Sequence, residues 1–103
     1  MSEILFTDDP EKQRYIATQN NHVVALAEYR ATTGALMLTH TEVNQDLEGQ
    51  GVGSSLIRFA LDDIRAKGLH VVPMCPFVVA FIKRHRAEYL DLVAAAHRGV
   101  FGL

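Results

Sequence analysis

Three glycines stand at alternate positions in the segment 48–55, with two serines directly behind them. Backbone N–H groups can converge on a phosphate only where no side chain intervenes, and glycine adopts the backbone angles that point several N–H groups inward. A helix that begins at such a loop adds its free first-turn N–H groups and a partial positive charge, which favours an anion without any lysine. A site for the phosphates of a nucleotide-like cofactor is therefore predicted at Glu48, Gly49, Gln50, Gly51, Val52, Gly53, Ser54 and Ser55.

The spacing around the glycines excludes two common nucleotide motifs. A P-loop requires Gly-Lys-Ser/Thr at the helix start, whereas Gly53 is followed by two serines. A dinucleotide fingerprint requires a further glycine, where this chain has Leu56, and an acidic residue about twenty positions on, where it has Pro73. A plain glycine-rich turn in front of a helix stays open as the alternative.

The chain before the glycines carries the signals of antiparallel strands. Strands are expected at 14–19, 22–31 and 35–43, because these runs are rich in apolar and β-branched residues. Asn20 and Asn21 tolerate the positive φ that a two-residue hairpin turn demands, and Thr32-Thr33-Gly34 supplies a second turn. The prediction is an antiparallel meander that leads into the glycine loop.

A helix is expected to follow the glycine loop and to end near Lys67, because Gly68 suits a C-cap with positive φ. Its apolar residues recur at helical spacing: Leu56, Ile57, Ala60, Leu61 and Ile64. The short apolar run Leu69–Pro73 then reads as a strand next to this helix.

A second helix is expected from Pro76, whose missing N–H is unneeded in a first turn. The segment Glu88–Ala96 is expected to continue as helix after a break at Arg86-Ala87. The predicted fold class is α/β: an antiparallel meander, the glycine-loop helix, a strand and a C-terminal helix, in a single domain spanning residues 1–103.

Composition supports an ordinary globular domain. Of the 103 residues 49% are apolar and 21% are charged, and no segment reaches the roughly 18 apolar residues that span a bilayer. With no basic leader at the N-terminus, we expect a soluble, cytoplasmic protein without a membrane partner. The net charge is −2 and the cations are dispersed, so nucleic acid is not an expected partner.

Metal binding is not predicted either. Cys75 is the single cysteine in the sequence, which excludes an intramolecular disulfide and any multi-cysteine metal site. The histidines other than His40 show no spacing typical of metal ligands.

The stretch Glu48-Gly49-Gln50-Gly51-Val52-Gly53 resembles the Gln/Arg-x-x-Gly-x-Gly/Ala motif of Gcn5-related N-acetyltransferases. The segments 38–43 (LTHTEV) and 72–78 (VPMCPFV) look like those of a small subfamily of minimal, single-domain acetyltransferase-like proteins. The resemblance runs from about Arg14 to Val93. Glu48 stands where the wider family usually has Gln or Arg, and a carboxylate there repels a phosphate unless it points away.

The resemblance implies a truncated acetyltransferase fold that binds acetyl-coenzyme A. The strand 35–43 would pair through its backbone, around Thr41 and Val43, with the pantetheine arm, and the amides near 49–54 would take the pyrophosphate. The implied function is transfer of an acetyl group to an unidentified amine. A module that binds coenzyme A (CoA) or acetyl-CoA without transferring it is the alternative.

Acetyl transfer from a thioester to an amine needs a neutral amine, a stabilised oxyanion and a proton for the departing thiolate. In the resembling subfamily the cysteine at the position of Cys75 is thought to lie beside the acetyl group, where it could accept that group or protonate the sulfur. His40 could deprotonate the amine, and Glu42, on the same strand face, could orient His40 or attract a cationic amine. A packing role for Cys75, a hydrogen-bonded sheet histidine and a merely solvated glutamate stay open, as do the acceptor and the oligomeric state.

Overall fold

The computed structural model describes residues 3–103, so residues 1–2 of the predicted domain lie outside the described residues. The strands are β1 (Leu5–Asp9), β2 (Arg14–Gln19), β3 (His22–Thr32), β4 (Ala35–Val43) and β5 (His70–Pro73). The α-helices are α1 (Val52–Ala66), α2 (Pro76–Arg84), α3 (Arg86–Tyr89) and α4 (Ala95–Arg98). Short 3-10 segments are η1 (Pro10–Lys12), η2 (Gln45–Leu47), η3 (Leu90–Leu92) and η4 (Gly99–Phe101).

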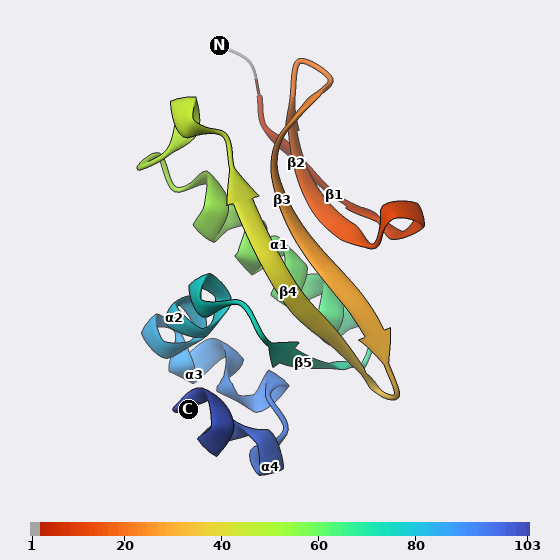
Figure 1. The fold of residues 1–103 in the computed structure, drawn as a ribbon, viewed down its shortest axis with the longest axis vertical. Helices are drawn as coiled ribbons and strands as arrows, with labels where there is room; N and C mark the ends of the chain where they lie inside the picture. The colour runs from red at the N-terminus through yellow and green to blue at the C-terminus, as the bar shows by residue number, and fades with distance from the viewer. Residues whose placement is uncertain (1–2) are drawn as a thin grey trace.

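The strands form one five-stranded sheet in chain order. Strands β1 to β4 are antiparallel neighbours, and β5 lies parallel to β4 after the chain has passed through α1 (Figure 1). The predicted α/β class is therefore confirmed, with its meander, glycine-loop helix and added strand. Asn20 and Asn21 both have positive φ, 52° and 66°, as the two-residue turn requires.

Strand β1 is an addition that the sequence pattern does not predict. Its residues lack a clear apolar alternation, and Leu5 at its start is exposed. Long-range contacts hold it: Tyr29 donates a hydrogen bond to Asp8 at 2.7 Å, and the Lys67 ammonium lies 2.8 Å from the same carboxylate. The Phe6 ring also stacks on Phe59 of α1.

Helix α1 packs on one face of the sheet, behind β3 and β4 in the view of Figure 1. The five apolar residues that predict this helix are all fully buried against the sheet: Leu56, Ile57, Ala60, Leu61 and Ile64. Gly68 has φ +71° just after the helix end, so the expected C-cap is confirmed. The opposite face of the sheet carries no helix in the described part of the chain.

The segment after α2 differs from the expected helix. His85 leaves helical geometry at φ −124°, ψ 41°, and the prediction of a helix over Glu88–Ala96 is wrong, since α3, η3 and α4 are short and separate. Val93 and Ala94 are extended, and the Val93 carbonyl is satisfied by the Arg98 side chain at 2.9 Å instead of by a helix N–H. Side-chain bonds from Arg58 to Glu88 and from Arg65 to Asp91 hold this segment on α1.

A bulge in β4 decides which of its residues face α1. Glu28 opposes His40 while Tyr29 opposes Leu38, so Thr39 is the extra residue on β4. Before the bulge the even-numbered residues of β4 are buried toward the helix, and after it the odd-numbered Thr41 and Val43 point that way.

Candidate functional site

A pocket of about 490 Å³ lies where the end of β4 meets the start of α1. Both elements and the start of α2 contribute to its walls. The lining residues are Thr41, Val43, Leu47, Glu48, Gly49, Gly51, Val52, Gly53, Ser54 and Phe77. The structure thus brings together eight of the ten residues that the sequence predicts for cofactor binding; Gln50 and Ser55 do not line the pocket.

The two remaining residues serve the loop itself. The Gln50 side chain donates to the Asp46 carbonyl at 3.3 Å, and the Ser55 N–H donates to the Gly51 carbonyl at 2.9 Å. Ser55 is thus the first residue of α1 whose N–H is used by the helix, which leaves the N–H groups of Val52, Gly53 and Ser54 without a backbone partner in the described chain. These free groups lie in the pocket wall and suit an anion.

Glycine is required in the loop for two different reasons. Gly49 and Gly51 both have φ +80°, which other residues rarely adopt, and open space surrounds the position of an added Cβ. Gly53 is helical, but a Cβ there would lie 3.0 Å from the Phe77 ring and 3.0 Å from a methyl group of Val43. The first two glycines shape the turn, and Gly53 allows β4, α1 and α2 to meet.

Cys75 lies next to this pocket. It is the N-cap of α2, with Pro76 in the first helical position, and it is buried with 7% of its surface exposed. Its thiol donates a hydrogen bond to the Thr41 hydroxyl, with Sγ and Oγ1 3.5 Å apart. Thr41 lines the pocket whereas Cys75 does not, so the thiol is connected to the pocket through the Thr41 hydroxyl.

The structure does not place His40 and Glu42 on that wall. Their side chains contact each other, with Nε2 and Oε2 3.2 Å apart, and both are exposed. The bulge at Thr39 turns them to the face of the sheet that has no helix, opposite to Thr41 and Val43. The pair therefore lies across β4 from the Cys75 thiol.

Sequence reasoning missed the contributions of Leu47 and Phe77 to the pocket. Phe77 reads in the sequence as part of the apolar face of α2, yet its side chain is 40% exposed. The signal that could have found it is Gly53, because a glycine inside a helix indicates that another side chain approaches closely.

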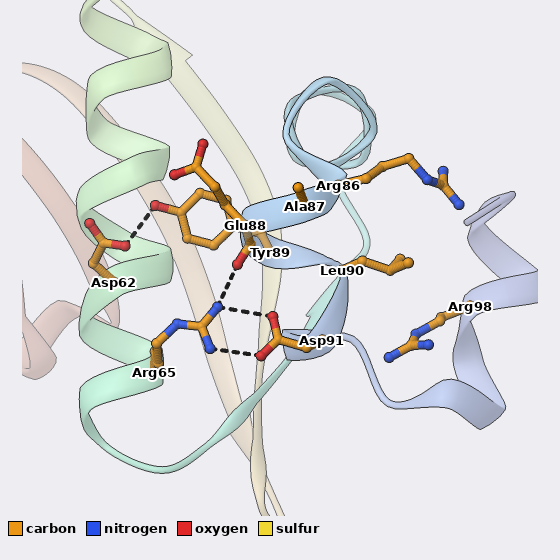
Figure 2. Close-up of a pocket in the computed structure, with 9 residues that line it drawn as sticks. All are labelled: Asp62, Arg65, Arg86, Ala87, Glu88, Tyr89, Leu90, Asp91 and Arg98. Atoms are coloured by element: carbon orange, nitrogen blue, oxygen red, sulfur yellow. Dashed lines mark hydrogen bonds and ion pairs between the residues drawn. The ribbon is translucent and has the colours of Figure 1, made fainter.

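A second pocket, of about 640 Å³, lies between α1 and the C-terminal helices (Figure 2). Its charged groups largely satisfy one another: Arg65 forms a bidentate pair with Asp91, and Tyr89 donates to Asp62 at 2.6 Å. Burial, followed by that hydrogen bond, raises the pKa of Tyr89 to about 12. This larger pocket contains none of the predicted site residues, and its paired charges have a structural explanation in holding the C-terminal helices on α1.

Two further features concern residues 3–103 only. No helix there is both long and apolar enough to cross a membrane. Nor does that part of the chain bring three or more His, Cys, Asp or Glu side chains into a group that could hold a metal ion.

Solved structures with the same architecture define the class of fold. The solution structure of a GCN5-like protein from Staphylococcus aureus matches with a TM-score of 0.69 and 23% identity, and the match covers 90% of each chain. The ribosomal-protein-S18-alanine N-acetyltransferase from Escherichia coli matches with a TM-score of 0.53 and 24% identity over 56% of this chain. The matched part is 38% of the Escherichia coli chain.

The sequence places the chain within that class. The profile of the GCN5-related N-acetyl-transferase family matches residues 14–92, so the chain belongs to this family. The resemblance inferred from the glycine loop is thereby confirmed. No curated protein sequence is significantly similar to the chain.

Proposed function

We propose that this protein is an acetyl-CoA-dependent N-acetyltransferase that acts on an unidentified amine. One observation carries the proposal: the Cys75 thiol contacts Thr41, which lines the glycine-loop pocket. The Thr41 hydroxyl oxygen lies 3.5 Å from Cys75 Sγ. Membership of the family supports the same reaction and the same donor.

Three parts of this chain are suited to bind acetyl-CoA, the acetyl donor. The free N–H groups of Val52, Gly53 and Ser54 would hold the pyrophosphate at the start of α1. The edge of β4 beyond Leu38, where pairing with β5 stops, would hydrogen-bond the pantetheine arm around Thr41 and Val43. The side chain of Phe77 would cover the arm from the α2 side.

Cys75 would then act on the thioester in one of two ways. As an acid, it gives its proton to the CoA sulfur while the acceptor nitrogen forms the new bond to the acetyl carbon and the C–S bond breaks. As a nucleophile, its thiolate would attack the acetyl carbon, the C–S bond to CoA would break, and the departing CoA thiolate would take up the proton that Cys75 gave away. The amine would then displace the Cys75 thiolate from the acetyl carbon in a second step. In both cases the proton released by the amine must go to a base.

His40 is our proposed base, and the Glu42 carboxylate 3.2 Å away would hold and stabilise its protonated form. The bulge in β4 puts both exposed side chains on the face of the sheet opposite to Thr41, so the acceptor would approach β4 from there while the donor lies on the α1 side. The amine nitrogen would reach the acetyl carbon past the edge of β4 beyond Leu38, where pairing with β5 stops.

A binding module without transfer is the second candidate. It is favoured by the separation of the only proposed base from the thiol, since His40 and Cys75 lie on opposite faces of β4 and Cys75 is buried. Such a protein would retain the donor pocket and hold CoA thioesters without releasing an amide product.

The two candidates are separated by two measurements. Binding of acetyl-CoA should raise the free energy of unfolding by about 2.7 kcal/mol when the free ligand is at one hundred times its dissociation constant. Incubation with isotope-labelled acetyl-CoA and a lysate, followed by mass spectrometry, should show the label on amines. Thermal stabilisation without labelled product would indicate the binding module, and a melting temperature unchanged by millimolar acetyl-CoA would exclude both.

A further inference from the structure

The donor pocket is built from a stretch of chain without any cation. No lysine or arginine occurs between Arg30 and Arg58, and this stretch supplies every lining residue of the pocket except Phe77. The same stretch contains three carboxylates, Glu42, Asp46 and Glu48. Of these, Glu48 lines the pocket itself.

Most cations elsewhere in the described chain are already bound to other groups. The Arg58 guanidinium lies 2.6 Å from the Glu88 carboxylate, and the Arg65 guanidinium lies 2.7 Å from the Asp91 carboxylate. The other cations held by acceptors are Arg14 on Asp9, Lys67 on Asp8 and Asp63, Arg86 on the Leu103 carbonyl, and Arg98 on the Val93 carbonyl.

The four remaining cations lie in other parts of the fold. Lys12 belongs to η1, and Arg30 pairs with Met37 in the half of β4 away from the pocket. Phe77, which lines the pocket, is at the start of α2. Lys83 and Arg84 are at the other end of this helix, away from the pocket. Within residues 3–103, the backbone N–H groups at the start of α1 are thus the positive end of this pocket.

The Glu48 carboxylate is free to act on a ligand. Its backbone N–H donates to the Gln45 carbonyl at 3.2 Å, but its side chain has no hydrogen-bond or ion-pair partner among the described residues. A phosphomonoester adds a charge of about −1.5 to −2 at neutral pH. Glu48 would repel any phosphate near it. The free N–H groups of Val52, Gly53 and Ser54 compensate a phosphate at the start of α1, whereas a second phosphate beyond their reach would find no compensating group in the described chain.

Resting on the proposed function, we propose that this site recognises an acyl thioester of a pantetheine phosphate and does not recognise the 3′-phosphate of CoA. Recognition ends at the phosphates next to the pantetheine, which the N–H groups of α1 can hold. Glu48 is the residue that sets this preference. A dephospho-CoA thioester therefore binds at least as tightly as the corresponding CoA thioester.

Isothermal titration of the full chain with CoA, dephospho-CoA, 4′-phosphopantetheine and pantetheine tests the proposal. Dephospho-CoA should bind as tightly as CoA within about threefold, or more tightly, and pantetheine should bind at least about tenfold more weakly than 4′-phosphopantetheine. A preference for CoA over dephospho-CoA of about tenfold or more would overturn the proposal and leave the proposed function intact. Absence of binding by all four ligands would overturn both.

A charge-reversal pair tests the role of Glu48. Glu48→Arg should tighten CoA binding by about fivefold more than it tightens dephospho-CoA binding, and this gain should shrink in high salt. Glu11→Arg, at an exposed position in η1, makes the same change in net charge away from the pocket and should leave the ratio of the two affinities unchanged. An equal effect of Glu48→Arg on both ligands would show that Glu48 does not set the preference.

Discussion

At the scale of single residues, the thiol of Cys75 combines burial with a polar partner. A purely packing cysteine needs no acceptor, whereas this thiol donates to a hydroxyl that itself lines a ligand pocket. Pro73 ends β5 and Pro76 begins α2, so restricted backbone angles hold the thiol on both sides. The backbone on both sides of the thiol thus has fewer accessible conformations than an ordinary loop.

Replacing this thiol should separate binding from transfer. Cys75→Ala should leave CoA affinity unchanged, because the phosphates are held by the glycine loop, and should abolish or strongly slow acetyl transfer. If Cys75 is a nucleophile, wild-type protein incubated with acetyl-CoA should carry an adduct of about 42 Da, the mass of an acetyl group, that the variant lacks. Full transfer activity in Cys75→Ala would reduce Cys75 to a packing residue.

The Thr41 hydroxyl should contribute to the rate of acetyl transfer. Thr41→Val keeps the shape of the side chain but removes the acceptor of the Cys75 thiol, and a hydrogen bond of ordinary strength contributes about 0.5–1.5 kcal/mol. We expect kcat to fall by about two- to tenfold with little change in the Kd for CoA, measured by steady-state kinetics and titration. Thr41→Ser retains the hydroxyl and should restore most of the rate; equal losses in both variants would contradict a role for the hydroxyl.

At the scale of elements, the glycine loop connects β4 to α1 in the region where α2 packs against both. Gly51 and Gly53 differ in why they are glycine, since the first needs positive φ and the second needs space. The two positions therefore offer a way to separate the cost of backbone strain from damage to the pocket.

Gly53→Ala should weaken CoA binding more than it weakens folding. The added methyl group would press on the Phe77 ring and the Val43 side chain, both of which line the pocket, and Phe77 can yield because it is partly exposed. Gly51→Ala meets no atom but must hold φ near +80°, which costs about 1–2 kcal/mol of stability. Denaturant unfolding and CoA titration of both variants would test this, and a larger stability loss for Gly53→Ala than for Gly51→Ala would contradict it.

At the scale of the whole molecule, one polar cluster joins the N-terminal hairpin to the end of α1. Asp63 accepts hydrogen bonds from Tyr15 at 2.7 Å and from Lys67 at 2.7 Å, and Lys67 also binds Asp8 of β1. Burial by itself would raise the pKa of Asp63, but the hydrogen bonds from Lys67 and Tyr15 outweigh burial and lower this pKa below its ordinary value.

The lowered pKa of Asp63 predicts sensitivity to acid. A carboxyl group with a lower pKa in the folded chain stabilises the fold above its unfolded pKa, about 4, and this contribution is lost as the pH falls through the folded value. The free energy of unfolding should therefore decline below about pH 4. Asp63→Asn should be less stable at neutral pH and should show a flatter decline in urea titrations across that window.

Glu11→Gln is the control for this measurement, because Glu11 is exposed and has no ion-pair partner in the described chain. It should reproduce the wild-type pH profile. An Asp63→Asn profile parallel to wild type would show that the cluster does not couple stability to pH.

Features governed by neighbouring residues could be predicted from the sequence. The Asn20-Asn21 turn, the apolar stripe of α1, the Gly68 C-cap and the start of α2 at Pro76 all follow from local backbone angles and periodicity, and the structure confirms each of them. The glycine loop belongs to the same group, because φ near +80° at Gly49 and Gly51 is a local requirement. The family motif at this loop then identified the fold.

Features governed by contacts across the chain were decided only by the tertiary structure. Strand β1 is held by its pairing with β2 and the bonds to Asp8, and the broken C-terminal segment is bonded to α1 through Arg65 and Asp91. The bulge at Thr39 arises from pairing with β3, and it alone turns His40 and Glu42 away from the pocket while turning Thr41 toward Cys75. A side-chain period of two cannot foresee such a shift, because one extra residue reverses the faces of every residue that follows.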